Sequence, residues 1–445
     1  MQYNEAFGNK EVLFRFRNRD YNFSLSHGLF SSADIDSGSR FLLKVFSRLL
    51  DDEYENKKPL PQKILDAGSG IGVLGICAAG ALSSLGAGQL HVRAQDRDEL
   101  ARIFTAINAE KNNVNSNQLS AHTEPLLAGP EGECYDLILT NIPAKAGLPV
   151  LEDFVLRSLC LLNPEGKILL VAVNTLSEFF ARLIANNAIL LKREDGSGHT
   201  VFLFGRDAKK NSRSLQNLST VDFYLKCPAY MRNSSNYEIE KIPYNLDAIH
   251  GAQGFDNPGN EIQAAAKLTT KIKKEISCLQ APHNVLIFSE DQGHYPAWLV
   301  KYLNNDLNIT LVGRNILALS LARHNTAIAL SAQTEKIRII SAADLQLDKN
   351  RILKRDNPDN RGESSGIQQD QKFNFIAIFP EQVPGTDRIE ATWEALADLS
   401  LPSAVIIAGF SSSEAERFDR KKTQGFTRLG DIKRKGFRAL AYRRN

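Results

Sequence analysis

An internal repeat constrains the fold of this chain more than any other feature of its sequence. Four stretches of the first half return, in the same order, in the second half of the 445 residues. The pairs are Ser26–Leu43 with Ile249–Leu268, Lys63–Gly72 with Asn284–Gly293, Gln95–Asn108 with Val312–Asn325, and Tyr135–Gly147 with Phe373–Gly385. One such match is common between unrelated α/β domains. Four in series, with shared His-Gly, Gly and Asn residues, predict a duplicated domain.

Short apolar runs alternate with helix-length segments through both halves of the chain. Those of the first half are Lys63–Leu65, Leu90–Ala94, Leu137–Thr140, Ile168–Val173 and Val201–Phe204. Those of the second half are Val285–Phe288, Ile309–Val312, Ile337–Ile340, Phe375–Phe379 and Ala404–Ala408. Buried strands separated by helices are typical of parallel βαβ units. We therefore expect a three-layer α/β fold used twice, over residues 1–207 and 208–445, with a polar, basic stretch starting at Arg206 between the copies.

The composition is that of an ordinary globular protein. The 54 Lys and Arg residues exceed the 51 Asp and Glu residues by three, so a nucleic-acid surface would have to be a local patch. The five cysteines are scattered and form no CxxC pair, which argues against a disulfide framework or a zinc cluster. No apolar run approaches the ~20 residues of a membrane helix. We expect a cytoplasmic protein that needs neither a membrane nor a metal.

A glycine-rich turn follows the first apolar run of the repeat. Ile64–Gly75 reads ILDAGSGIGVLG, a short strand ending in Asp66 and then a loop before a helix of small residues. Glycines let the backbone turn tightly and let a ligand approach the start of the helix. The loop also satisfies the G-x-G-x-x-G pattern of dinucleotide-binding proteins, and Asp96 follows where a ribose partner is expected. The motif alone therefore leaves a dinucleotide, another nucleoside ligand and a purely structural turn open.

The acidic residue before the first glycine favours one of these ligands. Its position resembles the D/E-x-G-x-G-x-G motif of class I S-adenosylmethionine-dependent methyltransferases, which have a Rossmann-like fold. The resemblance implies that the loop holds the methionine part of S-adenosylmethionine, that Asp66 orders the loop, that Asp96 binds the ribose and that Glu124 lies near the adenine. An ordinary solvated glutamate is the alternative for Glu124. The cofactor-binding candidates are Asp66, Gly68, Ser69, Gly70, Gly72, Asp96 and Glu124.

A second motif ends the fourth strand of the first copy. The sequence DLILTNIPAKAG resembles the (N/D)PP(F/Y) loop of amino-directed methyltransferases. The resemblance implies that Asn141 and the Ile142 carbonyl accept hydrogen bonds from the amine and that Pro143 stiffens the loop, since positioning is the main source of such catalysis. Ala144 replaces the aromatic residue that stacks on the target base, and another ring, such as Phe30 or Phe154, could substitute for it. An isolated N-x-P would favour a helix-start turn, but after the glycine loop and Asp96, at the end of the fourth strand, the functional interpretation is preferred.

A narrower resemblance comes from the segment before the glycine loop. Its G-x-F-S-x4-D-x-G-x3-L pattern is similar to that of the "methyltransferase small" family. The matching residues are Gly28, Phe30, Ser31, Asp36, Gly38 and Leu42. That family includes bacterial enzymes with two tandem methyltransferase-like domains, one defunct, that methylate N2 of guanine in ribosomal RNA. Lys145 stands where their catalytic loop has histidine, which makes it a candidate substrate contact.

The resemblance implies an S-adenosylmethionine-dependent N-methyltransferase whose substrate is the exocyclic amine of guanine in ribosomal RNA. One departure concerns the order of the copies, because the intact copy of those enzymes is C-terminal and here it is N-terminal. The missing aromatic residue keeps two alternatives open. One is a methyltransferase for a small molecule or a protein amide, and the other is a non-catalytic RNA-binding scaffold.

The second copy has lost the residues of both motifs. The repeat places Ile287 opposite Asp66 and Gly313 opposite Asp96, and it places Phe379 opposite Asn141. Glu290 and Asp291, in the former glycine loop, are expected to repel a cofactor carboxylate, so this copy is predicted to keep the fold without the cofactor. Its C-terminal cations are either a solvated face or an RNA contact. They are Arg428, Lys433, Arg434, Lys435, Arg438, Arg443 and Arg444.

Overall fold

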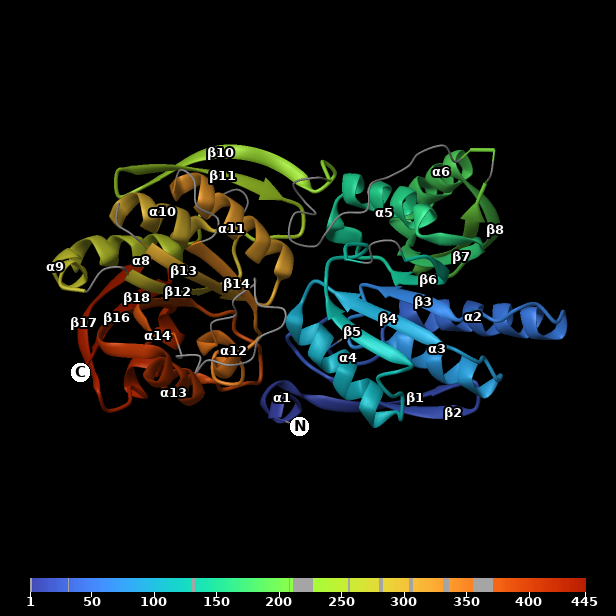
Figure 1. Cartoon of the computed structure of the whole chain (residues 1–445), viewed down its shortest axis with the longest axis horizontal. Coiled ribbons are helices and arrows are strands. Elements are labelled where there is room, and N and C mark those ends of the chain that lie inside the picture. The colour runs from blue at the N-terminus through green and yellow to red at the C-terminus, as the bar shows by residue number, and fades with distance from the viewer. Residues whose placement is uncertain are drawn as a thin grey trace, which may run out of the picture. The chain divides into compact units, whose positions relative to one another are not determined.

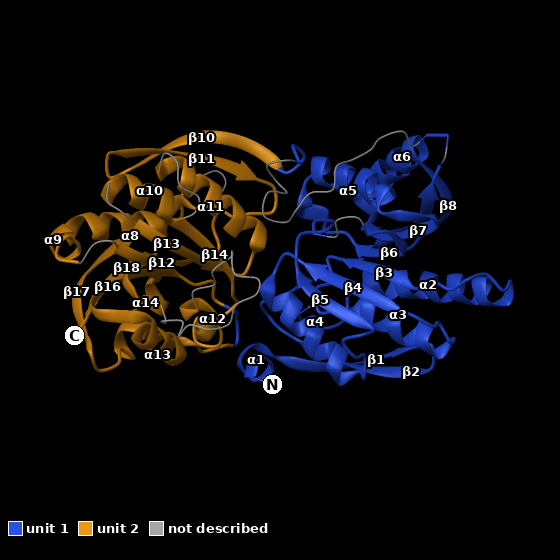
Figure 2. Cartoon of the chain, viewed as in Figure 1, with its two compact units in different colours: residues 1–230, 383–385 blue, residues 231–382, 386–445 orange. Residues whose placement is uncertain are grey.

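The computed structural model divides the chain into two compact units (Figure 2). The first comprises residues 1–230 and 383–385, and the second comprises residues 231–382 and 386–445. The described residues are 2–30, 32–129, 133–207, 209–210, 227–254, 257–279, 283–303, 307–330, 336–354 and 371–445. The predicted boundary between residues 207 and 208 adjoins residues outside this set and stays a prediction.

The first unit is a seven-stranded sheet between helices, preceded by a short helix and a two-stranded hairpin (Figure 1). Its elements are α1 (Gln2–Phe7), β1 (Lys10–Phe16), β2 (Arg19–Leu25), α2 (Ser37–Glu55), β3 (Lys63–Ala67), α3 (Val73–Ser84), β4 (His91–Asp96), α4 (Glu99–Lys111), β5 (Leu119–Thr123), β6 (Tyr135–Asn141), α5 (Leu148–Cys160), β7 (Leu162–Val173), α6 (Ser177–Asn187), β8 (Ala188–Asp195) and β9 (His199–Arg206). The sheet order is β5-β4-β3-β6-β7-β9-β8, in which β9 runs opposite to the other six strands.

Two layers of helices bury this sheet. Helices α2, α3 and α4 contact one another over one face, while α5 and α6 pack on the other. Helix α3 is built of small and aliphatic residues that are buried almost all round, which lets it lie close over the strands. Strand β3 is buried from Ile64 to Ala67 and lies inside the sheet between β4 and β6, as its short apolar run predicts.

The second unit has the same architecture. Its elements are β10 (Met231–Ile239), β11 (Ile242–Ile249), α8 (Asn260–Lys271), α9 (Lys273–Ser277), β12 (His283–Ser289), α10 (His294–Leu303), β13 (Leu307–Gly313), α11 (Ile316–Leu330), β14 (Ile337–Ser341), α12 (Lys349–Leu353), β15 (Phe373–Phe379), α13 (Ile389–Leu399), β16 (Ser400–Ser411), α14 (Ser412–Arg420), β17 (Phe426–Arg434) and β18 (Phe437–Arg444). Among the described residues, no helix is both long and apolar enough to span a membrane.

The order of strands confirms the tandem duplication. The second sheet runs β14-β13-β12-β15-β16-β18-β17, so each sheet has its strands in the order third, second, first, fourth, fifth, seventh, sixth, behind an antiparallel hairpin. The pairing register agrees with the sequence alignment, because Asp66 and Ile287 have equivalent partners on the neighbouring strands. The antiparallel seventh strand distinguishes both sheets from the strand order of dinucleotide-binding domains.

A buried asparagine ties the hairpin, the glycine loop and a helix together in the first unit. The Asn108 Oδ1 accepts the Ser24 N–H at 2.8 Å, and its Nδ2 donates to the carbonyls of Ser24 at 3.1 Å and Ile71 at 2.9 Å. Asn108 lies on α4, Ser24 on β2 and Ile71 in the glycine loop, so one side chain links three segments.

The second unit repeats this link. Asn325, on α11, accepts the Asp247 N–H at 2.9 Å and donates to the carbonyls of Asp247 at 3.0 Å and Gln292 at 2.8 Å. Both asparagines are fully buried. The shared Asn of the repeat therefore has a structural role that does not depend on the cofactor motifs.

We expect the substitution Asn108→Ala to lower the free energy of unfolding by roughly 3 kcal/mol, because it leaves buried backbone groups of Ser24 and Ile71 unpaired at ~1–3 kcal/mol each. Asn325→Ala should cause a similar loss in the second unit. Urea denaturation followed by circular dichroism measures both. A change within about 0.5 kcal/mol, the usual range for surface substitutions, would contradict the assigned role.

Candidate active site

The predicted site residues gather at one edge of the first sheet. Strands β3, β4 and β6 are parallel neighbours, so their carboxyl ends bring the glycine loop, Asp96 and Asn141 to the same edge. In open α/β sheets, ligands bind outside the carboxyl ends of the strands. The structure therefore brings the two sequence motifs together.

The glycine loop adopts a backbone that only glycine accepts easily. Gly68, Gly70 and Gly72 have φ angles of +79°, +57° and +87°. A Cβ added at Gly70 would meet nothing within 4 Å, and one added at Gly68 would meet only a Leu126 methyl at 3.8 Å. These two glycines thus border open space that an approaching ligand can use. At Gly72 a Cβ would instead lie 3.0 Å from Thr105, so this glycine is required by packing.

The Ser69 side chain faces inward and holds the loop. Its Oγ lies 3.3 Å from the Thr105 Oγ1, and that hydroxyl donates to the Gly70 carbonyl at 3.0 Å. The backbone N–H groups of Gly68 and Ser69 both donate to the Gln95 carbonyl, at 2.9 and 3.0 Å. The side chain and the backbone N–H of Ser69 therefore both help to fix the conformation of the loop.

Asp66 lies on β3 and is fully buried, with its carboxylate beside the first turn of α3. Its Oδ2 accepts the Gly75 N–H at 2.8 Å, and Gly75 permits this approach because a Cβ there would lie 2.9 Å from the same oxygen. The Oδ1 has no hydrogen-bond partner among the described residues. Burial raises the pKa of Asp66 to about 7, the Gly75 N–H opposes this effect, and nearby Asp96 adds to it.

Asp96 closes over the loop from the neighbouring strand. Its Oδ2 accepts the Gly70 N–H and its Oδ1 the Asp98 N–H, both at 3.0 Å. Burial and the adjacent Asp98 carboxylate raise the pKa of Asp96. Each carboxylate oxygen has a second lone pair, so both can still accept a hydroxyl proton.

The Glu124 side chain is held by an ion pair. Its Oε2 lies 2.6 Å from the Arg93 Nη2, with only 20% of the side chain exposed, and its backbone N–H donates to the Asp96 carbonyl at 2.8 Å. The structure places Glu124 beside Asp96 at the sheet edge but commits its carboxylate to Arg93. That partner had no signal in the sequence.

Asn141 is anchored to the start of α2. Its Nδ2 donates to the Asp36 Oδ1 at 2.7 Å and to the Ser39 Oγ at 3.2 Å. The same Asp36 oxygen accepts the Ser39 N–H at 2.8 Å and caps the helix. With Nδ2 engaged, the Asn141 Oδ1 is the amide atom left to accept a further hydrogen bond. Asp36 belongs to the family pattern before the glycine loop, but nothing in the sequence indicates its contact with Asn141.

The loop after Asn141 is open on one side. Ile142 is buried and its N–H donates to the Val171 carbonyl at 3.2 Å, whereas Pro143, Ala144 and Lys145 are exposed. The described part of the chain holds no ion pair to Lys145. Its predicted contact with the substrate stays a prediction.

One of the two rings suggested in place of an aromatic at Ala144 is wrong. Phe154 is 1% exposed, on α5, and packs into the core against β3, β6 and β7, so it cannot reach a substrate. Phe30 is 78% exposed and precedes Asp36 by six residues. Its neighbour Ser31 lies outside the described residues.

The methyltransferase small domain model matches residues 20–189 of the chain. An uncharacterised Bacillus subtilis protein, YbxB, is 30% identical over 159 residues, which are 36% of this chain and 71% of that protein. The chain belongs to the methyltransferase small domain family.

Other relatives match over shorter lengths. Vibrio cholerae ribosomal RNA small subunit methyltransferase C is 33% identical over 27% of this chain and 30% of its own length. Ribosomal protein L11 methyltransferase of Prochlorococcus marinus is 34% identical over 28% of this chain and 39% of its own length. The chain thus spans less than half of either protein.

A solved structure shares the whole architecture of this methyltransferase. The Thermus thermophilus 16S rRNA N2 G1207 methyltransferase, solved with AdoMet and guanosine, has a TM-score of 0.61 over 99% of this chain and 100% of its own. At 14% identity this likeness shows the fold, with its two tandem Rossmann-like domains.

The second unit of this methyltransferase fills its corresponding edge with its own side chains. Glu290 is buried and accepts the N–H groups of Arg314 at 2.8 Å and Asn315 at 3.2 Å, across from Gly313. Phe379, at the position of Asn141, is buried, with its ring 5.0 Å from that of Tyr295. Glu290 thus binds the backbone of the neighbouring loop, a structural role beyond the repulsion of a cofactor carboxylate that the sequence predicts.

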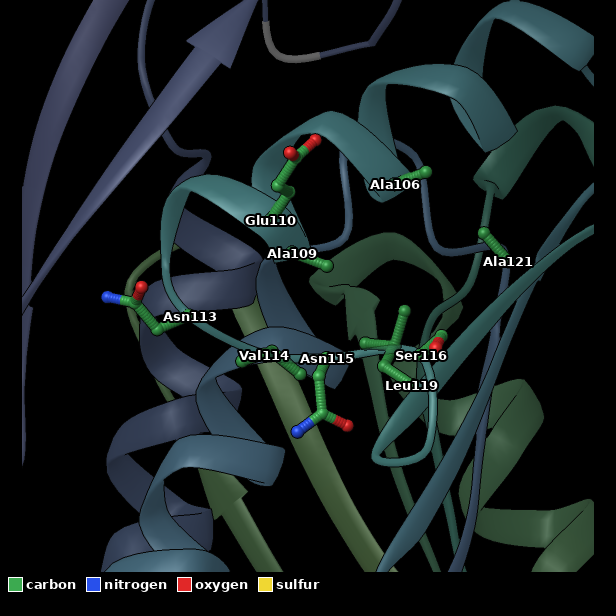
Figure 3. A pocket seen from close by; sticks show the side chains of 9 residues that line it. All are labelled: Ala106, Ala109, Glu110, Asn113, Val114, Asn115, Ser116, Leu119 and Ala121. Carbon is green, nitrogen blue, oxygen red and sulfur yellow. The ribbon is translucent and has the colours of Figure 1, made fainter.

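A hollow of about 460 Å³ lies away from this edge, between the end of α4 and the start of β5 (Figure 3). Its lining is mostly small apolar and amide side chains. They include Ala106, Ala109, Asn113, Asn115 and Ala121. Since Leu119 begins β5 there, the hollow is at the amino end of the strand and takes no part in the site.

The raised pKa of Asp66 predicts how stability depends on pH. Between about pH 4 and pH 7 the native chain keeps a proton that the unfolded chain releases, so this group lowers the free energy of unfolding as pH rises towards its native pKa of about 7. Asp66→Asn keeps an acceptor for the Gly75 N–H and removes the titration. Urea denaturation at several pH values should show the wild type losing stability relative to this variant up to about pH 7 and no further. Parallel pH dependences would contradict the prediction.

Proposed function

We propose that this chain is an S-adenosylmethionine-dependent N-methyltransferase that acts on the exocyclic amine of guanine in ribosomal RNA, in the cytoplasm. The observation that carries the proposal is the fixed amide of Asn141 at the same sheet edge as the glycine loop. Its Oδ1 is the atom that would accept a hydrogen bond from the amine.

The loop suits the proposed cofactor. The open space beside Gly68 and Gly70 would take the methionine part, and the Asp96 carboxylate would accept the ribose hydroxyls. Asp66 would contribute the order of the loop through its bond to Gly75. When bound, S-adenosylmethionine supplies an electrophilic methyl group.

The protein's own part in the reaction is positioning. The Asn141 Oδ1 and the Ile142 carbonyl would each accept one amine hydrogen, which turns the nitrogen lone pair away from the protein and towards the methyl donor. Pro143 restricts the backbone between these acceptors and the exposed Ala144 and Lys145. Holding two reactants in one geometry lowers the entropic barrier without any nucleophilic side chain.

RNA is favoured over other amines by the architecture. Two tandem domains over the full length are shared with an enzyme that acts on 16S rRNA. A protein amine is the second candidate, because ribosomal protein L11 methyltransferases are among the relatives and Ala144 offers no stacking ring. An RNA substrate accounts for both the site and the presence of the second unit.

The second unit is proposed to contact RNA with only part of its basic cluster. Arg428, Arg438 and Arg443 form ion pairs with Asp419, Asp431 and Glu275. Lys433 and Lys435, at the β17–β18 turn, are exposed, and no described carboxylate pairs with them. These two lysines are therefore the cations we assign to phosphate contact.

Replacing Asn141 tests the proposed function. Asn141→Ala should lower kcat for methyl transfer to unmethylated ribosomal RNA by about 10²-fold or more, because the amine loses its orientation. Calorimetry should show S-adenosylmethionine binding unchanged. Asn187→Ala, at the end of α6 next to the amino end of β8, is the control and should behave as wild type.

Three results would oppose this proposal. Full activity of Asn141→Ala would remove the assigned role of the amide. Methyl transfer to ribosomal protein and not to RNA would favour the second candidate, and binding of RNA without any transfer would favour a scaffold.

Phe30 is the remaining candidate to stack on the target base. Phe30→Ala should lower kcat/KM for RNA by about 5-fold to 150-fold, the equivalent of ~1–3 kcal/mol for stacking on one base, with cofactor affinity unchanged. Tyr54→Ala is the control, since Tyr54 is a 58% exposed aromatic residue near the other end of α2. Equal losses in both variants would contradict a specific role for Phe30.

A further inference from the structure

We infer that Asp36 is a positioning residue that sets the direction of the Asn141 amide. The inference rests on the proposed function, in which the Asn141 Oδ1 receives the amine. The two residues are 105 positions apart in the sequence and meet at the carboxyl edge of the first sheet.

The chemistry of the contact selects one orientation of the amide. A carboxylate only accepts hydrogen bonds, so the Asn141 Nδ2 must face Asp36, at 2.7 Å, and the Oδ1 must face away. An ionised acceptor makes this bond stronger than one between neutral groups. The Ser39 Oγ, at 3.2 Å from the same nitrogen, engages it a second time. Asn141 would otherwise be free to present nitrogen, a donor, to an amine that needs an acceptor.

The start of α2 holds the carboxylate in one place. Asp36 is the N-cap of the helix, and its Oδ1 accepts the Ser39 N–H at 2.8 Å. A Cβ added at Gly38 would lie 3.1 Å from this oxygen and 3.1 Å from the His199 Cδ2. The glycine therefore lets the His199 ring pack against the turn that carries Asp36, which leaves the carboxylate little freedom to move.

The second unit provides an internal comparison. Helix α8 corresponds to α2, and its N-cap is Gly259, which has no side chain to reach a neighbouring strand. The strand residue opposite is Phe379, which has no amide. Glu261 folds back over Gly259. Asp36 and Asn141 are thus absent together from the unit that has lost the other motif residues, as expected if they act as a pair.

Two substitutions distinguish a role of Asp36 in orienting Asn141 from a role in capping the helix alone. Serine is as good an N-cap as aspartate, but its side chain is too short to hold Asn141 as well. Asparagine keeps a carbonyl oxygen that can accept both hydrogen bonds. Asp34→Asn is the matched control, because Asp34 is a nearby carboxylate that pairs with Arg40 at 2.8 Å and does not contact Asn141.

We expect Asp36→Ser to lower kcat for methyl transfer to ribosomal RNA by about 10²-fold, with KM for RNA, affinity for S-adenosylmethionine and helix content unchanged. Asp36→Asn should restore most of the activity, and Asp34→Asn should match wild type. Wild-type activity of Asp36→Ser would overturn the inference, as would a loss that Asp36→Asn does not rescue.

A second measurement does not depend on activity. The side-chain NH₂ signal of Asn141 can be recorded in protein labelled with ¹⁵N-asparagine and assigned by its loss in Asn141→Ala. It should shift in Asp36→Ser and stay in place in Asp34→Asn, and an unmoved signal in Asp36→Ser would overturn the inference. If the wild type transfers no methyl group to RNA, the proposed function fails, while this signal still decides whether Asp36 orients the amide.

Discussion

The buried amide of Asn108 is the interaction on which the geometry of the site depends. It joins β2, the glycine loop and α4 through a single buried side chain, and the Thr105 hydroxyl adds a second link between α4 and the loop. A buried amide with all its hydrogen-bond partners stabilises the fold only modestly, but its loss leaves several polar groups unpaired in the protein interior, which is costly. Asn325 makes the same three bonds in the second unit, where the cofactor motifs are gone. The link is therefore a requirement of the fold, and the first unit builds its site on it.

The two units also solve one electrostatic problem in different ways. Backbone N–H groups point towards one place where the loops after the first two strands of each sheet meet, and a carboxylate accepts hydrogen bonds from them. In the first unit Asp96 reaches from β4 to the Gly70 and Asp98 N–H groups. In the second unit Glu290 reaches from the opposite loop to Arg314 and Asn315, over a glycine that gives it room. Both units therefore keep a carboxylate at this place, but a different residue supplies it. In the second unit Gly313 stands at the position of Asp96, and the buried Glu290 provides the carboxylate instead.

Sequence reasoning predicted the parts of this molecule that follow from strand register. Asp96 and Asn141 lie at the same edge of the sheet because parallel strands end there, and the repeat located their lost counterparts, Gly313 and Phe379. What it missed depends on side chains that cross between elements. The ion pair of Arg93 with Glu124 and the contact of Asp36 with Asn141 join residues 31 and 105 positions apart. The burial of Phe154 was missed for a related reason, since α5 turns that ring towards the sheet and the apolar pattern alone did not exclude a solvent-facing position.

The division of labour at the site explains how an Asn-x-Pro loop without an aromatic residue can remain useful. In the proposed function, choosing an amine depends on the direction of the Asn141 side-chain oxygen, and that direction would come from a helix cap and a strand end, both rigid elements. Gripping a planar base depends on an exposed ring, and a ring can be supplied by any segment that reaches the site. The two tasks reside on separate elements, so the change to Ala144 removes one contact without disturbing the amide. Loss of Asp36 would do the opposite, because it would leave every surface for the substrate intact and remove the reason for Asn141 to present oxygen.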